Sequence, residues 1–416
     1  MGVIGLGARA EARCRELSRP PYSEDPNALT RTYLTPPHRA AMDRIAGWMR
    51  ETGMSIREDE AATLVGRLEG TKPGSPALVF GSHIDSVRDA GCYDGPLGVM
   101  LALACVEAIA AAGRRPPFAI EIVAFGDEEG SRFQTSMNAS RAFVGRLAEV
   151  KLDVRDRDGT TLADALTAFG RDPTRIASVT RERSSVLAFV EPHIEQGPVL
   201  ETAGAALGVV TSIAGQWRLK VRFAGRAGHA GTTPMHLRAD ALAAAAEAVL
   251  AAERIATEGP ADLVATVGQV AAKPGAPNVI PGHAEITIDV RAGTDPVRDE
   301  GLRQIEAAIA EIAMQRGVKV EVERVQNLPA ARMDARLQGL LKRAAEKFGH
   351  AAPELVSGAG HDAMMLADFA PTAMLFIRCA GGISHNPAES VTPEDCEAAL
   401  GVLLAFVDVF AAEQPE

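Results

Sequence analysis

The chain has 416 residues, which is too long for one ordinary hydrophobic core and predicts two domains. Its hydrophobic fraction of 47% and charged fraction of 23% are typical of a globular protein. The formal net charge of -11 argues against a nucleic-acid partner, because a polyanion binder carries a basic surplus. No apolar run reaches membrane-spanning length, so we expect no membrane partner either.

The five cysteines form no C-x-x-C pair and no disulfide framework. Free cysteines of this kind favour a reducing compartment, and we expect the protein to be cytoplasmic. Cys92 lies within a candidate site segment and could be reactive. We favour the simpler interpretation, a small packing side chain.

The first half of the chain alternates apolar strands with helices. Residues 36–53 have helical apolar spacing and a terminal glycine, and residues 97–112 are apolar on nearly all sides, which predicts a buried helix. Strands are predicted at 77–80, 118–125 and 186–190, each followed by polar residues. This order indicates an α/β fold, in which ligands gather beyond the carboxyl ends of the strands.

The middle of the chain has a different order of elements. It predicts β-α-β-β-α-β, the ferredoxin-like split motif, at residues 216–223, 238–257, 264–271, 284–291, 296–315 and 318–325. We therefore predict an inserted domain at 213–326. The main domain would combine residues 1–212 and 327–416, and a further strand at 372–377 would belong to it.

Polar residues with metal-binding chemistry follow the predicted strands. His83 and Asp85 form an H-x-D pair, in which the carboxylate could fix the imidazole tautomer. Asp94 lies in a glycine-rich turn that would allow a close approach to two cations. A solvated Asx turn explains Asp94 alone equally well.

Two adjacent carboxylates, Glu128 and Glu129, end the second strand. Their side chains would diverge on an extended backbone, so one could bind metal while the other faces the substrate water. His193 ends the third strand, and His385 lies in a glycine-rich loop. Each of these residues alone could be an ordinary polar side chain. Together they have the mixed nitrogen and oxygen character that Zn²⁺ or Mn²⁺ prefers.

Several motifs in matching order resemble one family over roughly residues 30 to 400. They are GSHIDSVRDAGCYDGPLGV, FGDEEGSRF, EPHIEQGPVLE, GRAGHAGTTPM, PNVIPG with the following DVR, SGAGHDAMML and GGISHNPAE. The chain is similar to the N-carbamoyl-L-amino-acid hydrolases, β-ureidopropionases and allantoate amidohydrolases, relatives of the two-metal aminopeptidases. The resemblance implies an aminopeptidase-like catalytic domain with a mixed sheet and an inserted lid and dimerisation domain.

The resemblance also implies roles for individual residues. One metal would be held by His83, Asp94 and His193, and the second by Asp94, Glu129 and His385. The metals would be Zn²⁺ or Mn²⁺, with Co²⁺ or Ni²⁺ as further options. Glu128 would be the general base and Asp85 the orienting group. Cys92 departs from the family in detail, since a charged or polar residue is frequent at that position.

The substrate residues carry over in the same way. His229 would donate to the oxyanion, and in this family it comes from the partner subunit of a homodimer. The remaining substrate contacts would be Gln196, Asn278, Arg291, Gly360 and His361. Arg291 could pair with a substrate carboxylate through two parallel hydrogen bonds.

The implied reaction is hydrolysis of a small ureido acid, with allantoate as the first candidate, releasing ammonia and CO2. N-carbamoyl-L-amino acids or 3-ureidopropionate are the near alternatives. A metallo-aminoacylase or dipeptidase is more distant, because His193 and Gln196 argue against it. A scaffold that has lost catalysis is disfavoured, because no residue of the proposed set is missing.

Overall fold

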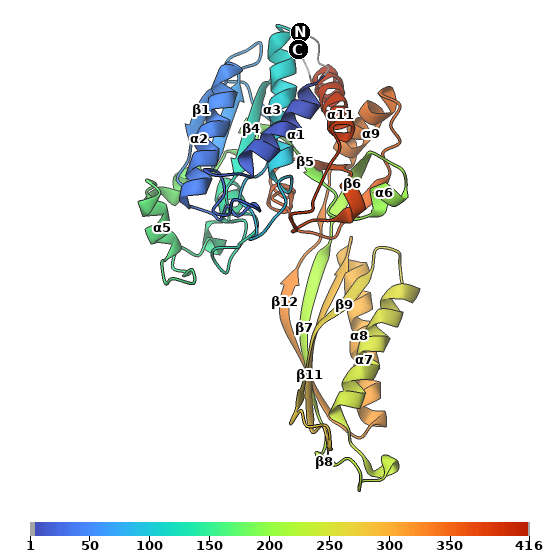
Figure 1. Ribbon diagram of the computed structural model, residues 1–416. Coiled ribbons are helices and arrows are strands. Elements are labelled where there is room, and N and C mark those ends of the chain that lie inside the picture. Colours follow the sequence, from blue (N-terminus) through green and yellow to red (C-terminus); the bar gives the residue numbers. More distant parts are fainter. Residues whose placement is uncertain (1–4, 415–416) are drawn as a thin grey trace. The chain divides into compact units, whose positions relative to one another are not determined.

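A mixed β-sheet forms the centre of the larger part of the protein in the computed structural model, which describes residues 5–414 (Figure 1). Its strand order is β1-β2-β4-β3-β5-β15-β6-β13, with β14 paired to β6. The strands are β1 (Ser55–Glu58), β2 (Leu64–Leu68), β3 (Ala77–His83), β4 (Ala119–Phe125), β5 (Val186–Ile194), β6 (Leu207–Ile213), β13 (Ala331–Arg332), β14 (Glu354–Ser357) and β15 (Thr372–Ile377).

The four central strands, β4, β3, β5 and β15, run parallel to one another. Neighbouring pairs toward both edges are antiparallel, including β2 with β4 and β15 with β6. The prediction of an α/β fold with a mixed central sheet is confirmed. Strands β3, β4, β5 and β15 are largely or fully buried, as their continuous apolar sequences require.

Helices pack against this sheet and against one another. They are α1 (Leu6–Leu17), α2 (Pro36–Glu51), α3 (Pro96–Ala111), α4 (Asn138–Phe143), α5 (Leu162–Ala168), α6 (Val199–Thr202), α9 (Ala335–Lys347), α10 (Ala363–Leu366) and α11 (Pro393–Ala412). Short 3₁₀ turns occur at Leu147–Glu149, Pro173–Val179, Arg183–Ser185 and Ala380–Gly382. Among the described residues, no helix is long and apolar enough to cross a membrane.

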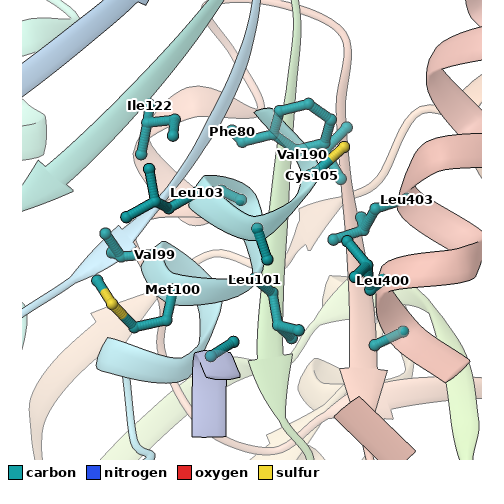
Figure 2. Close-up of a cluster of buried hydrophobic side chains, with 14 of the residues drawn as sticks. Phe80, Val99, Met100, Leu101, Leu103, Cys105, Ile122, Val190, Leu400 and Leu403 are labelled. Atoms are coloured by element: carbon teal, nitrogen blue, oxygen red, sulfur yellow. The ribbon is translucent and has the colours of Figure 1, made fainter. Parts of the chain in front are cut away.

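Helix α3 lies at the centre of the core, as its uniformly apolar sequence predicts. It contacts α1, α11, β3 and β5, and Figure 2 shows its side chains between the sheet and α11. A Cβ atom on Gly98 would lie 2.0 Å from the carbonyl oxygen of Pro192, so only glycine allows this helix to approach β5 so closely. The contact lies beside His193, at the end of the strand.

The chain divides into two compact units, of which the sheet described above belongs mainly to the first. The first comprises Met1–Thr211, Met333–Leu355 and Gly360–Glu416, and the second Ser212–Arg332 and Val356–Ala359. The predicted ends of the main domain, residues 1–4 and 415–416, lie outside the described residues.

The second unit is an antiparallel sheet of order β12-β7-β11-β9 with α7 and α8 packed against one face. Its elements are β7 (Gly215–Ala224), β8 (Gly228–His229), a 3₁₀ turn at Met235–Leu237, α7 (Ala241–Glu258), β9 (Val264–Lys273), β10 (Val279–Ile280), β11 (His283–Ala292), α8 (Asp295–Gln315) and β12 (Lys319–Leu328). Its main strands and helices have the ferredoxin-like order β-α-β-β-α-β.

Candidate metal centre

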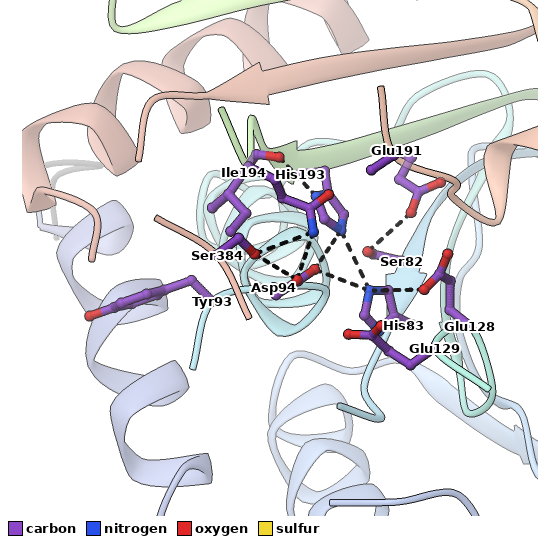
Figure 3. Close-up of polar contacts among 12 residues, drawn as sticks. Ser82, His83, Tyr93, Asp94, Glu128, Glu129, Glu191, His193, Ile194 and Ser384 are labelled. Atoms are coloured by element: carbon purple, nitrogen blue, oxygen red, sulfur yellow. Dashed lines mark hydrogen bonds and ion pairs between the residues drawn. The ribbon is translucent and has the colours of Figure 1, made fainter. Parts of the chain in front are cut away.

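The carboxyl ends of three neighbouring parallel strands bring polar side chains together in the first unit (Figure 3). His83 is the last residue of β3 and pairs in register with Phe125, the last residue of β4. The chain bends after Phe125, and Glu128 and Glu129 follow after two intervening residues. His193 lies at the end of β5, which also pairs with β3. The parallel arrangement therefore gathers residues that are far apart in the sequence.

A first group of three buried candidate metal ligands consists of His83, Asp94 and His193. Asp94 Oδ1 lies 3.5 Å from His83 Nε2 and 3.3 Å from His193 Nε2. The two Nε2 atoms are 3.5 Å apart. Each Nδ1 faces a backbone carbonyl, that of Asp85 at 3.1 Å and that of Ile194 at 2.9 Å. A proton on each Nδ1 leaves two Nε2 lone pairs facing the same point, where a cation fits.

A second group consists of Asp94, Glu129 and His385. His385 Nε2 lies 3.1 Å from Asp94 Oδ2 and 3.5 Å from Glu129 Oε1. Asp94 therefore presents one carboxylate oxygen to each group. Glu129 Oε1 is buried without a hydrogen-bond donor, which also favours a cation there. The donor set fits two divalent cations that share Asp94.

The titration behaviour of these carboxylates reflects burial and neighbouring charge. Burial alone would raise the pKa of Asp94, but contacts from His193, His385 and His83 hold that pKa well below its usual value. Burial, and then the charge of Asp94, raises the pKa of Glu129 to about 7. The site therefore combines a firmly ionised carboxylate with one that a cation would help to ionise.

Glu128 is buried and points toward the first group. Its Oε2 lies 4.0 Å from His83 Nε2. Burial raises the pKa of Glu128 well above its usual value, against the opposing charge of His83. A buried carboxylate beside a candidate ligand group is placed to exchange a proton with a water held there, as a general base must.

Asp85 contacts the two glutamates through its carboxylate and the imidazole of His83 mainly through its backbone carbonyl. Its carboxylate accepts hydrogen bonds from the backbone N–H groups of Glu128 at 3.1 Å and Glu129 at 3.2 Å. The imidazole of His83 lies nearer to the carbonyl of Asp85, at 3.1 Å, than to its carboxylate, at 3.4 Å. The Asp85 carboxylate thus lies beside the imidazole, and it also orients the backbone of the two glutamates.

The glycines around Asp94 make room for protein side chains. Gly95 has a φ of 81°, and a Cβ there would lie 2.5 Å from ring atoms of His83. A Cβ on Gly91 would lie 2.2 Å from Cβ of Glu389. We predicted that these glycines let Asp94 approach two cations closely. In the structure they also let the side chains of His83 and Glu389 pack against the turn.

Gln196 lies beside this turn. Its Nε2 donates to Asp94 Oδ2 at 2.7 Å and lies 3.3 Å from the hydroxyl oxygen of Ser384. Both Gln196 and His385 have positive φ angles, 59° and 53°, which are uncommon for residues other than glycine. Such backbone strain concentrates at functional sites.

Gly360 and His361 also lie in the first unit, near the proposed base. The His361 ring packs edge-on against His193, with 4.4 Å between ring centroids. Burial, and then the charge of His193, holds the pKa of His361 well below its usual value. A Cβ on Gly360 would lie 3.9 Å from Glu128 Oε1.

Three predicted substrate residues lie in the second unit. His229 in β8 pairs with Val279 in β10, and the N–H of Ala230 donates to the carbonyl of Asn278 at 2.9 Å. His229 Nδ1 accepts from Gly231 N at 3.0 Å, which places the proton of the neutral ring on Nε2. His229 is exposed, so it offers an outward-facing donor.

Arg291 in β11 is held by Asp289 and by the carbonyl of Gly358. Its Nε and Nη2 donate to the two carboxylate oxygens of Asp289, at 2.8 and 3.2 Å. The guanidinium also lines an open hollow of about 920 Å³ in this unit. Sequence reasoning missed Asp289, although its position two residues earlier on the same face of the strand is a usable signal.

Comparisons with known proteins identify the family of this chain. A profile of the peptidase family M20/M25/M40 matches residues 79–409. The chain is 41% identical to an N-carbamoyl-L-amino acid amidohydrolase of Geobacillus stearothermophilus, over 93% of this chain and 94% of the relative. It is 38% identical to the allantoate deiminase of Arabidopsis thaliana, over 97% of this chain and 82% of the relative.

A solved structure gives the same result. The crystal structure of an amidase of the hydantoinase/carbamoylase family from Burkholderia multivorans matches with a TM-score of 0.91 and 34% identity, covering 99% of this chain and 98% of that chain. The match of the family profile spans both units and all five candidate metal ligands. The chain belongs to the peptidase family M20/M25/M40.

Proposed function

We propose that this protein is a metal-dependent hydrolase that cleaves carbon–nitrogen bonds in small ureido acids. The observation that carries the proposal is the buried carboxylate of Glu128 beside two ligand groups that share Asp94. Relatives that are 41% and 38% identical are named for N-carbamoyl-amino-acid and allantoate hydrolysis, which supports a ureido substrate.

The five ligands would hold two divalent cations, for which we propose Zn²⁺ or Mn²⁺. Cations in such a site lower the pKa of water and polarise a carbonyl group. Glu128 would take the proton of the attacking water and pass it to the leaving nitrogen. Asp85 would hold the backbone of Glu128 in place for both transfers.

Further residues of the chain would bind the substrate. His229 would donate from Nε2 to the developing oxyanion, for which its hydrogen-bonded tautomer is suited. Arg291 and Asn278 would bind the carboxylate. Gln196, Gly360 and His361 would contact the ureido group beside the ligands.

Allantoate is the first candidate substrate, and N-carbamoyl-L-amino acids are the second. The second candidate rests on the 41% identity to an N-carbamoyl-L-amino acid amidohydrolase. Ammonia release should be measured with allantoate, N-carbamoyl-L-methionine and 3-ureidopropionate, using Mn²⁺-loaded protein and a chelator-treated control. The highest kcat/KM identifies the substrate, and a strong preference for a carbamoyl amino acid would overturn the choice of allantoate.

The same assay tests the reaction class. Dipeptides should be cleaved far more slowly than the best ureido compound, since His193 and Gln196 distinguish the site from that of a peptidase. Comparable rates on dipeptides would instead support an aminoacylase or dipeptidase. Absence of turnover on every compound with metal bound would support a scaffold.

We also propose a cytoplasmic homodimer that forms through the second unit. Strand β9 is an edge of its sheet and has one charged residue, Lys273 at its end, whereas the opposite edge β12 has four. An edge with few charges is suited to pairing with a second copy. Val264 and Val270 are exposed on β9. The five cysteines are free thiols, which supports a reducing compartment.

A further inference from the structure

Glu389 lies near the ligand groups, and the assignments above give it no role. It is 5% exposed and follows His385 by four residues in the loop before α11. Its Oε1 accepts from the backbone N–H of Tyr93 at 2.8 Å and from that of Asp94 at 3.1 Å. One carboxylate oxygen therefore holds the main chain of the shared ligand.

The second oxygen of Glu389 reaches the side chain of Asp94 through Ser384. The Ser384 hydroxyl lies 3.1 Å from Glu389 Oε2 and 2.9 Å from Asp94 Oδ2. Asp94 Oδ2 is the oxygen that faces His385. Main chain and side chain of Asp94 are thus both fixed to the loop that supplies another ligand.

The loop itself is tight, and the opposite turn is shaped to receive it. The N–H of Glu389 donates to the carbonyl of Asn386 at 3.0 Å, which closes the turn after His385. Across the contact, a Cβ on Gly91 would lie 2.2 Å from Cβ and 2.4 Å from Cδ of Glu389. Only glycine at position 91 leaves space for the stem of this side chain.

We propose that Glu389 is a positioning residue that sets Asp94 and His385 at the spacing needed for the second cation. The inference rests on the proposed two-metal function. Glu389 does not contact the cluster as a ligand; it acts through Asp94 N, Tyr93 N and Ser384. Residues behind metal ligands typically contribute about 10- to 100-fold in metal affinity.

The test measures Co²⁺ binding to metal-stripped, full-length protein. Calorimetry gives the affinities, and the visible absorption of bound Co²⁺ reports on its coordination. Wild type should bind two ions. Glu389→Ala should weaken one of the two sites by about 10- to 100-fold and leave the other within about threefold. Glu389→Gln should restore the affinity to within about threefold, because its amide oxygen still accepts from both N–H groups and its NH₂ can reach Ser384.

Two further variants separate positioning from general stability. Gly91→Ala should reproduce the Co²⁺ defect of Glu389→Ala, because its Cβ excludes the Glu389 side chain. Asp395→Ala is the matched control: Asp395 is 3% exposed, lies at the start of α11 and pairs with Arg378 without contacting a ligand. It should lower the melting temperature and leave both Co²⁺ affinities unchanged.

The outcomes distinguish the two proposals. If wild type binds two ions and Glu389→Ala binds both with wild-type affinity, or if Asp395→Ala shows the same defect, the positioning role is wrong and the two-metal function stands. If wild type does not bind two ions, the proposed function fails, and the positioning role fails with it.

Discussion

Asp94 belongs to both ligand groups, with one carboxylate oxygen directed at each. A single aspartate can serve two cations only if its orientation is fixed, and at least three residues fix it here. Gln196 and Ser384 donate to its side chain, and Glu389 accepts from its main chain. At the residue scale, the sequence therefore predicts the ligands better than the residues that hold them.

Neighbouring glutamates should respond differently to the same substitution. Glu128→Gln should lower kcat by at least about 100-fold, the usual contribution of a positioned acid–base group, while two Co²⁺ ions still bind. Glu129→Gln should instead weaken binding of the second ion, because Glu129 belongs to the group with Asp94 and His385. Steady-state kinetics and Co²⁺ titration of both variants check this. Unchanged turnover in Glu128→Gln would exclude it as the base.

Helix α2 shows how packing sets the properties of an element. Its length follows from apolar spacing, as predicted, but the sequence leaves the state of His38 open. In the structure His38 is fully buried and stacked against Phe169, with 5.3 Å between ring centroids. Its Nδ1 accepts from the N–H of Leu34 at 3.1 Å. Burial lowers the pKa of His38 from 6.5 to about 3.

This histidine should make folding sensitive to mild acid. Its folded pKa lies below the unfolded value, so its contribution is fully present above pH 6.5 and is lost as pH falls from 6.5 toward 3. Between pH 7 and pH 5, the free energy of unfolding of wild type should fall by about 2 kcal/mol more than that of His38→Asn. Urea denaturation at several pH values measures the difference. Parallel pH curves would show that His38 does not stay neutral.

Helices α1 and α11 are elements about which the positions of strand ends give no information. Both pack against α3, and neither carries a predicted site residue. The rule that ligands gather at carboxyl ends of strands points to β3, β4, β5 and β15 and is silent about the helices that cover them. It identified the four strands because each is apolar and ends in a polar group.

At the scale of the whole molecule, the residues singled out from the sequence are divided between the two units. The candidate metal centre lies within the first unit, and His229, Asn278 and Arg291 lie in the second. The first unit contains every proposed metal ligand. The two edges of the sheet in the second unit differ in charge, with one charged residue on β9 and four on β12, and this difference allows its proposed dimerisation to be tested.

Two matched substitutions test the dimer. Val270 on β9 and Val325 on β12 are each 57% exposed, on opposite edges of the sheet. Val270→Lys should place like charges across the proposed interface and raise the dimer dissociation constant at least about tenfold. Val325→Lys should have no such effect. Light scattering should give twice the 43.7 kDa chain mass for wild type; equal responses of both variants would reject the β9 edge.

The sequence by itself determined the elements and the chemistry at their ends. Continuous apolar strands, a uniformly apolar helix and polar residues at strand ends and in glycine-rich loops predicted the fold and the five candidate ligands. These signals are local, because burial of a strand or helix is recorded in its own residues. The family resemblance added roles to the same residues.

Only the tertiary structure decided which atoms meet. His83 and His193 are 110 positions apart, and Asp94 and Glu389 are 295 apart. Their contacts depend on the register of β3 with β4 and β5 and on a loop that no strand pattern predicts. The hydrogen bonds from the two glutamates to Asp85 and the fit of Glu389 against Gly91 likewise depend on tertiary packing. Hydrogen bonds require distances near 3 Å, and over such sequence separations packing of the folded chain sets them.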